Sequence, residues 1–256
     1  MDFVDKVVII TGASSGIGKY CAMDFARHSA KLVLVGRNVN NLKETKDECE
    51  RISGIGALTV VADITKEDDI DRIIKDTIEH YGKIDVLVNN AGRLVMAGVR
   101  DSITNYDKVS AVNVRGTYML TQRAIPHLIE TKGNIVNVSS VLSTNAIPSL
   151  TAYCMTKAAV DMLTKCAALE LADKGVRVNS VNPGPIATEL FRRAGLDEEA
   201  NRHAYASMGA AMPLQKIATS DDVAKLVVFL ASDYASSITG ATHLIDCGLH
   251  LGKPVL

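Results

Sequence analysis

Short apolar runs alternate with longer amphipathic stretches from one end of the chain to the other. Short runs rich in Val, Ile and Leu predict buried strands. These runs lie at Val7–Ile10, Leu32–Val35, Ala57–Val61, Ile84–Val88, Asn134–Val138, Val176–Val181 and His243–Asp246. Strands that alternate with helices predict one parallel sheet covered on both faces, a doubly wound α/β fold of about seven strands.

The stretches between these runs carry the periodicity and the end signals of helices. The first stretch follows a glycine-rich turn after Ile10 and ends at about His28, and another ends at about His80. The remaining stretches cover residues 40–52, 104–131, 152–173 and 221–231. Thr65 with Asp68 resembles a capping box, and Thr219 or Ser220 is expected to cap the last helix. Residues 186–216 have an irregular pattern.

No linker or repeat divides the chain, so we expect one domain over residues 1–256. Its composition is that of an ordinary globular protein, with 47% hydrophobic and 22% charged residues. A formal net charge of -1 gives no electrostatic reason to expect nucleic acid or an anionic membrane as a partner. No apolar run approaches the ~18 residues of a membrane span. The five cysteines are odd in number and form no C-x-x-C pair, which favours a reducing, cytoplasmic compartment.

The first predicted strand runs into Thr11-Gly-Ala-Ser-Ser-Gly-Ile-Gly18, and a helix follows. A glycine-rich turn between a strand and a helix makes an anion site, because backbone N–H groups point outward and the helix dipole favours negative charge. The glycine spacing here is G-x-x-x-G-x-G. A tight turn without a ligand is the alternative interpretation.

The second predicted strand ends in Gly36-Arg37-Asn38, where a doubly wound sheet approaches the adenosine ribose of a dinucleotide. This tripeptide has no carboxylate to accept a hydrogen bond from a ribose 2′-hydroxyl. Arg37 suits a 2′-phosphate, and a charge-assisted hydrogen bond of about 1.5–3 kcal/mol predicts a roughly tenfold to hundredfold preference for NADP(H) over NAD(H). Alternatively, Arg37 is an ordinary surface charge.

Tyr153 and Lys157 are four residues apart in Tyr153-Cys-Met-Thr-Lys157. On a helix their side chains share one face, with Cβ atoms about 5–6 Å apart. An ammonium about 4 Å away lowers the pKa of a phenol from about 10 by roughly 3 units at an effective dielectric near 20. The pair predicts a tyrosine that serves as acid and base near neutral pH. A solvent-facing pair is the alternative.

The chain also has Asn89-Asn-Ala-Gly92, a serine at position 140, thirteen residues before Tyr153, and Pro183-Gly184. With these motifs in this order, the chain resembles the short-chain dehydrogenase/reductase (SDR) family over about 4–249. It is similar to 3-oxoacyl-[acyl-carrier-protein] reductases and hydroxysteroid dehydrogenases of that family. The resemblance implies a Rossmann-fold enzyme with a cofactor half over about 1–130 and a catalytic half over about 131–256.

The resemblance implies a role for each matching residue. Ser140 would bond the substrate oxygen, Tyr153 would be the acid and base, and Lys157 would bond the nicotinamide ribose. Asn113 would hold a water in a proton relay, unless it is a solvent-facing helix residue, and Ser139 is expected to be structural. The implied cofactor-binding residues are Gly12, Ser14, Ser15, Gly16, Ile17, Gly18, Arg37, Asn38, Asp63, Ile64, Asn90, Ala91, Gly92, Tyr153, Lys157, Pro183, Gly184, Ile186 and Thr188. No metal is expected.

Two positions depart from the family pattern. Ser15 stands where NADP(H) enzymes of this kind often have a basic residue, so Arg37 alone carries the NADP(H) preference. Cys247 replaces a glycine often found near a subunit contact in family tetramers. The resemblance still implies a homotetramer, with the helices that carry Asn113 and Tyr153 at one interface.

Substrate recognition is expected in the loops after Gly92 and Ser140 and in a substrate loop over about 186–216. The candidate pocket residues are Leu94, Met96, Ser140, Leu142, Ile147, Leu190, Phe191 and Met208. Binding sites are mainly hydrophobic, so these residues favour a steroid, terpenoid or 3-oxoacyl ketone over a sugar, although they could equally serve packing.

Two other functions remain open. The first is a 3-oxoacyl-[acyl-carrier-protein] reductase, whose acidic carrier would need a basic rim. Lys132, Lys174, Arg192 and Arg193 are the candidates for that rim. The second is a redox sensor that binds the dinucleotide without catalysis.

Overall fold

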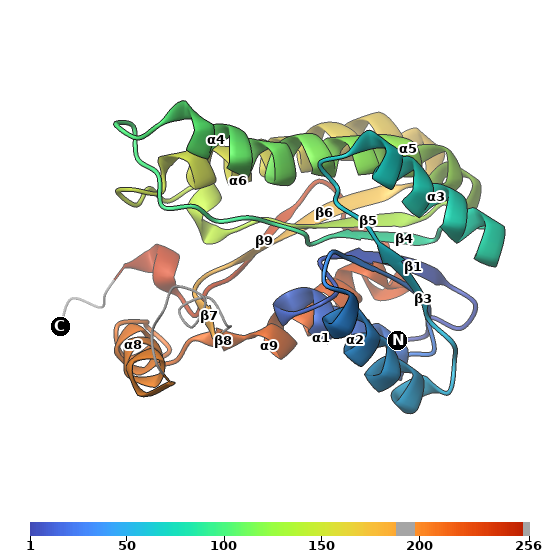
Figure 1. Cartoon of the computed structure of the whole chain (residues 1–256), viewed down its shortest axis with the longest axis horizontal. Helices are drawn as coiled ribbons and strands as arrows, with labels where there is room; N and C mark the ends of the chain where they lie inside the picture. Colours follow the sequence, from blue (N-terminus) through green and yellow to red (C-terminus); the bar gives the residue numbers. More distant parts are fainter. Residues whose placement is uncertain (188–197, 253–256) are drawn as a thin grey trace.

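A seven-stranded parallel sheet forms the centre of the computed structural model, which describes residues 1–187 and 198–252. The strand order is β3-β2-β1-β4-β5-β6-β9 (Figure 1). The strands are β1 (Val7–Thr11), β2 (Lys31–Gly36), β3 (Leu58–Val61), β4 (Val86–Asn89), β5 (Asn134–Val138), β6 (Arg177–Pro183) and β9 (Thr242–Ile245). The expected doubly wound α/β fold is confirmed, and each predicted strand is present.

Two layers of helices cover the sheet. The helices are α1 (Gly16–Arg27), α2 (Val39–Ser53), α3 (Glu67–Tyr81), α4 (Ile103–Ser110), α5 (Thr117–Thr131), α6 (Thr151–Leu171), α8 (Glu198–Ala210) and α9 (Ser220–Ala231). In Figure 1, α1, α2 and α9 lie on one face of the sheet, and α3, α4, α5 and α6 lie on the other. No helix in the described ranges is both long enough and apolar enough to cross a bilayer.

Strand β1 lies in the middle of the sheet and is buried on both faces. Val8 and Ile10 belong to the core under α1 and α9, whereas Val7 and Ile9 belong to the core under α3 and α5. Successive strand side chains point to opposite faces, so an unbroken apolar run is what a doubly covered strand requires. This packing fixes the carboxyl end of β1, where the glycine-rich turn begins.

The helix expected over 104–131 is divided into three parts. Helix α4 passes into a π-helix over Ala111–Gly116, and α5 follows. A Cβ built at Gly116 would lie 2.6 Å from the carbonyl oxygen of Ile64, so the chain approaches the end of β3 more closely than a side chain allows. This close tertiary contact accompanies the change of helix type, and periodicity alone does not reveal it.

The expected capping box at Thr65 is wrong. Thr65 donates from its backbone N and its Oγ1 to Asp63 Oδ1, at 3.0 and 2.9 Å, and α3 begins later, at Glu67. Short polar side chains compete with helix caps through such local bonds. Thr219 does cap α9, in a capping box with Asp222.

The described part of the stretch over 186–216 is more regular than its sequence pattern indicates. The short strands β7 (Ile186–Ala187) and β8 (Ala218–Thr219) pair in parallel, and α8 lies between them along the chain. Because β7 is only two residues long and gains its partner from a distant segment, local periodicity gives no signal for it.

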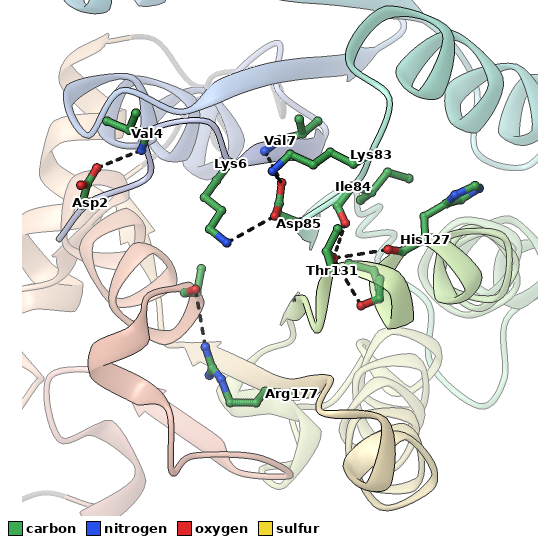
Figure 2. A network of polar contacts seen from close by, with 12 residues as sticks. Asp2, Val4, Lys6, Val7, Lys83, Ile84, Asp85, His127, Thr131 and Arg177 are labelled. Atoms are coloured by element: carbon green, nitrogen blue, oxygen red, sulfur yellow. Dashed lines mark hydrogen bonds and ion pairs between the residues drawn. The ribbon is translucent and has the colours of Figure 1, made fainter.

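Asp85 anchors the amino-terminal edge of the sheet (Figure 2). Its buried carboxylate accepts the backbone N–H of Val7 at 2.8 Å and forms ion pairs with Lys83 Nζ at 2.9 Å and Lys6 Nζ at 3.4 Å. At the same edge Arg177 donates to backbone carbonyls at the end of α9. Ligands of such sheets bind beyond the opposite, carboxyl edge, so we assign these charges a structural role.

Candidate active site

The turn between β1 and α1 is built by glycines. Gly12 and Gly16 have φ angles of 67° and 54°, in the left-handed region that other residues rarely adopt. A Cβ at Gly18 would lie 2.5 Å from Asn90 Nδ2 and would collide with the Gly12 carbonyl oxygen. The first turn of α1 contains no acidic residue. The positive end of its dipole therefore remains available to an anion.

Asn90 ties this turn to the end of β4. Its Nδ2 donates to the carbonyls of Thr11 at 2.8 Å and Gly12 at 3.3 Å. In return, Thr11 Oγ1 accepts the backbone N–H groups of Asn90 at 3.0 Å and Ala91 at 2.9 Å. Two neighbouring strand ends are thereby locked together, which places the glycine turn beside the segment after β4.

A cavity of about 310 Å³ opens at this edge. It is lined by many of the residues expected to bind a cofactor, namely Gly12, Ser14, Ser15, Gly16, Ile17, Arg37, Asp63, Ile64, Asn90, Ala91 and Gly92. Sequence reasoning missed Val35, Gly36, Ala62 and Val112, of which the first three could have been found from their places at strand ends. The close glycine cradle, the helix terminus and the cavity together fit a dinucleotide with its pyrophosphate.

Other expected cofactor residues lie outside the lining of this cavity. Asn38 caps α2 by accepting the backbone N–H of Asn41 at 3.0 Å. Gly184 follows β6, and a Cβ there would lie 2.8 Å from the Cα of Asp246, so glycine lets these two segments meet. Ile186 belongs to β7, and Thr188 lies outside the described residues. Cofactor contacts by these residues and by Gly18 and Pro183 stay predictions.

Arg37 stands at the rim of the cavity with 71% of its side chain exposed. Its Nη1 lies 3.7 Å from Asp63 Oδ2. The pKa of Asp63 is lowered, because hydrogen bonds from Thr65 and the charge of Arg37 outweigh the opposing effect of burial. Near neutral pH Arg37 therefore faces a carboxylate, with which an incoming phosphate would have to compete.

Tyr153 and Lys157 share one face of α6, as their spacing predicts. Lys157 Nζ lies 5.6 Å from the centroid of the Tyr153 ring and donates to the Val138 carbonyl at 2.8 Å. Ser140, which follows β5, lies close enough to Tyr153 for its hydroxyl to lower the pKa of the phenol, and its Oγ donates to the Pro183 carbonyl at 3.5 Å. Its Oγ also accepts the backbone N–H of Leu142 at 3.1 Å. Three candidate side chains, from α6 and from the end of β5, thus meet at the carboxyl edge of the sheet.

The acidity of the phenol differs from the expectation. Burial raises the pKa of Tyr153 to about 12, although its hydrogen bond with Ser140 acts in the opposite direction. Burial lowers the pKa of Lys157 to about 8, opposed by the charge of Asp161. The expected depression of the Tyr153 pKa is therefore wrong for the protein by itself. Desolvation disfavours the charged form of both groups and is the largest cause of each shift.

Asn113 is buried in the π-helix, so the solvent-facing alternative is wrong. Its Oδ1 accepts the backbone N–H of Arg93 at 2.8 Å, and its Nδ2 donates to the Arg93 carbonyl at 3.0 Å and to Thr156 Oγ1 at 3.1 Å. A Cβ built at Gly92 would lie 3.7 Å from Asn113 Oδ1 and 3.8 Å from Lys157 Nζ. Asn113 therefore borders the same space as Lys157, while its water-holding role stays a prediction.

A layer of buried polar side chains lies behind these residues. Ser139 Oγ donates to the Lys157 carbonyl at 3.2 Å, in the structural role expected for it. Asp161 and Asn182 form a hydrogen-bonded pair that sequence reasoning missed. Their signal is present in the sequence, since both are polar residues within apolar stretches that become buried.

The expected substrate residues have mixed environments. Leu94, Leu142 and Met208 are half-buried, whereas Met96 and Ile147 are 64% and 45% exposed. Leu190 and Phe191 lie outside the described residues, as do Arg192 and Arg193. A hydrogen bond of 3.4 Å from Ala152 N to the Ala97 carbonyl joins the loop after β4 to the start of α6. Exposed apolar side chains therefore occur on both loops that lead to Ser140 and Tyr153.

Comparison with known proteins identifies the family. The family model described as enoyl-(acyl carrier protein) reductase matches residues 12–250. A solved structure from Caenorhabditis elegans, described as a short-chain dehydrogenase/reductase of unknown function with cofactor, is 36% identical. It matches with a TM-score of 0.93 over 98% of this chain and 97% of that one. This chain belongs to the short-chain dehydrogenase/reductase family.

Other SDR relatives have named activities. The 3-oxoacyl-[acyl-carrier-protein] reductase FabG of Thermotoga maritima is 38% identical over 246 residues, which cover 95% of this chain and 97% of the relative. The L-sorbose reductase of Gluconobacter frateurii, solved with NADPH and L-sorbose, is 27% identical, with a TM-score of 0.91 over 97% of each chain. This SDR chain is accordingly an oxidoreductase of carbonyl and alcohol groups.

Proposed function

We propose that this SDR enzyme is an NADP(H)-dependent oxidoreductase that interconverts a ketone and a secondary alcohol on an apolar substrate. The observation that carries the proposal is the convergence of Ser140, Tyr153 and Lys157 at the edge that holds the cavity. A bound nicotinamide dinucleotide would supply or accept the hydride, and the residues around it would bind, orient and move the proton.

In the reductive direction Tyr153 gives its proton to the carbonyl oxygen, and in oxidation it takes that proton back. Ser140 bonds the same oxygen and stabilises the negative charge that develops there. Lys157 is charged below its pKa of about 8 and favours the phenolate that forms when the proton leaves. Proton transfer by a positioned group contributes about 10²–10⁴ to the rate.

Arg37 supports the preference for NADP(H). The segment Gly36-Arg37-Asn38 has no carboxylate for a ribose 2′-hydroxyl, and the exposed guanidinium lies at the rim of the cavity. The distance of 3.7 Å between Arg37 and Asp63 is longer than a charge-assisted hydrogen bond, so a 2′-phosphate could replace Asp63 as the partner of the guanidinium. The relative solved with NADPH supports this preference.

The half-buried Leu94 and Leu142 and the exposed Met96 and Ile147 favour an apolar ketone of the steroid, terpenoid or 3-oxoacyl type. A sugar ketone belongs in the same test, because the relative with L-sorbose shares the fold.

A 3-oxoacyl-[acyl-carrier-protein] reductase is the second candidate, favoured by the 38% identical relative with that name. Lys132 and Lys174 are both exposed, and Lys132 packs beside Gly175, so two cations are available on one rim for an acidic carrier protein. Binding to an acyl carrier protein that weakens with salt supports this candidate. Binding that is absent at low salt contradicts it.

Assembly as a homotetramer and a cytoplasmic location are part of the proposal. The helices α5 and α6 expose Tyr118, Met155, Met162 and Leu169, which a subunit contact would bury. The five cysteines are free, as expected in a reducing compartment. Light scattering at micromolar protein tests the assembly, and a monomer would overturn it.

The decisive experiment follows NADPH oxidation by absorbance with a panel of steroid, terpenoid, aromatic, 3-oxoacyl and sugar ketones, with NADH run in parallel. Tyr153→Phe is the test variant. Tyr234→Phe is the matched control, because Tyr234 is an exposed tyrosine that follows α9. Turnover of one ketone class with NADPH, lost in the first variant only, supports the proposal. If NADPH binds and no ketone reacts, the redox sensor becomes the better description.

A further inference from the structure

Asp161 lies one helical turn beyond Lys157 on α6, in the series Tyr153, Lys157, Asp161. Residues four apart on a helix are neighbours on one face. Lys157 is 5% exposed and Asp161 is 7% exposed, so both side chains are buried along the same face of α6. A buried charge is strongly disfavoured unless an opposite charge or hydrogen bonds compensate for it.

Hydrogen bonds from β6 hold the Asp161 carboxylate in place. Asn182 Nδ2 lies 2.8 Å from Asp161 Oδ2 and 3.1 Å from Oδ1, and Ser180 Oγ lies 3.3 Å from Oδ1. Asn182 Nδ2 donates to the carboxyl group, whereas the single hydroxyl proton of Ser180 is also within reach of Asn182 Oδ1, at 2.8 Å. The carboxyl group of Asp161 is therefore held in position by a strand that belongs to the core of the sheet.

The same asparagine reaches the catalytic serine. Asn182 Nδ2 also donates to the Ser140 carbonyl at 3.2 Å and to Ser143 Oγ at 3.0 Å. An amide has two N–H donors, so one serves Asp161 and the other serves the turn that begins at Ser140. Asp161 and the backbone of Ser140 are thus linked through one buried side chain.

We propose that Asp161 is a positioning residue that supplies the buried counter-charge of Lys157 and, through Asn182, holds the backbone of Ser140 in its catalytic place. This inference rests on the proposed roles of Tyr153 and Lys157 and adds to them the group that keeps the lysine charged. Asp161 itself does not touch the reacting atoms. It acts through the lysine and the asparagine.

Among the groups around Lys157, Asp161 is the one whose charge favours the protonated lysine. The lysine's own helix presents Tyr153 and Asp161, and β5 contributes the neutral Val138 carbonyl. The segments around Gly92 and Asn113 carry Arg93 and Arg115, and both of these residues are exposed. Burial lowers the pKa of Lys157 to about 8, and Asp161 acts in the opposite direction. Without the Asp161 charge, a larger share of Lys157 would be neutral near physiological pH.

The test compares Asp161→Asn with Ser180→Ala and Asp161→Glu in full-length protein labelled with 13C at the lysine ε-carbons. The resonance of Lys157 is identified by its loss in Lys157→Arg, and its titration is followed by NMR. Asparagine keeps the shape of Asp161 and removes the charge. Alanine at Ser180 removes a hydrogen bond and keeps the charge, and glutamate keeps the charge with altered geometry.

We expect the Lys157 midpoint to fall by about one pH unit in Asp161→Asn and to stay near the wild-type value in the other two variants. The alkaline limb of ketone reduction should move down by the same amount in Asp161→Asn, with the KM for NADPH unchanged. An unchanged midpoint in Asp161→Asn, or an equal fall in Ser180→Ala, would overturn the inference. If Asp161→Asn does not fold, Asp161→Ser provides the same comparison.

The NMR titration needs no turnover, so it separates two failures. A protein that reduces no ketone and still shows the lysine shift contradicts the proposed function and leaves the counter-charge in place. A protein that reduces a ketone and shows no shift contradicts only the role of Asp161.

Discussion

Lys157 Nζ lies 5.6 Å from the centre of the Tyr153 ring and donates to the Val138 carbonyl, so the ammonium is held beside the aromatic ring by β5. Desolvation is the largest cause of the pKa shift of each residue. The fold therefore brings the two side chains together. The pKa values of the Tyr153 phenol and the Lys157 ammonium then depend on any further charge that a bound molecule brings into the site.

Lys157 should make stability rise with pH. The lysine binds its proton up to about 10.5 in the unfolded chain and loses it near 8 in the folded protein. Between these values the unfolded state binds more protons, so the folded state gains stability as pH rises. Relative to Lys157→Met, wild type should gain about 3 kcal/mol in unfolding free energy between about pH 7 and about pH 10.5. Urea unfolding across this range measures the difference, and parallel curves for the two proteins would contradict it.

Arg37→Ala should weaken NADPH binding about tenfold to a hundredfold and leave NADH binding nearly unchanged, because only NADPH carries the 2′-phosphate. Isothermal titration calorimetry with both cofactors measures the change. Arg51→Ala, at an exposed arginine in the last turn of α2, is the matched control. Equal losses for NADPH and NADH in Arg37→Ala would mean that the residue maintains the cavity and does not select the cofactor.

Gly18→Ala should disrupt the dinucleotide turn. The new Cβ would meet Asn90 Nδ2 at 2.5 Å and the backbone carbonyl of Gly12, neither of which can move without loosening β1 from β4. We expect a loss of about 1–3 kcal/mol in stability and more than about tenfold weaker NADPH binding. Gly56→Ala is the control, since its Cβ would meet only Glu50 Oε1 at 3.9 Å. Thermal unfolding with and without NADPH reads out both effects, and wild-type values for Gly18→Ala would refute this account of the turn.

Asp85→Ala should destabilise the fold by about 2–3 kcal/mol, because the buried backbone N–H of Val7 loses its acceptor and two lysines lose their partner. Lys6→Ala should cost less than about 1 kcal/mol, because that ion pair is half-exposed. Urea unfolding gives both values. NADPH binding at the opposite edge should be unaffected in the folded fraction, so weaker binding there would assign Asp85 a role beyond the structural one.

The sequence predicted the elements whose signal is local. β1 and its neighbours appear as apolar runs because both faces of a central strand are buried, and the cap at Thr219 is visible because its partner Asp222 is three residues away. The glycine turn and the Tyr153-Lys157 spacing are local in the same sense. The glycine turn lines the cavity through Gly12, Ser14, Ser15, Gly16 and Ile17, whereas Tyr153 and Lys157 lie outside its lining.

One missed feature is local: Thr65 bonds Asp63, two residues away, and leaves α3 uncapped by its side chain. Other missed features depend on a distant partner. The short strand β7 pairs with β8, which comes from a later segment of the chain. Asn182 has no apparent function along the chain until folding places it between Asp161 and Ser140.

The sequence by itself determined the doubly wound fold and the glycine turn, and it singled out Ser140, Tyr153 and Lys157 as candidate catalytic residues. It could do so because apolar periodicity, backbone freedom and chemical identity are properties of short segments. Only the tertiary structure decided that Asn113 is buried, that Arg37 faces Asp63, and that Asp161 stands behind Lys157. It also decided the acidity of Tyr153 and Lys157. A pKa depends on how much water the fold removes and which charges it brings close, and neither quantity is written in the spacing of residues along a chain.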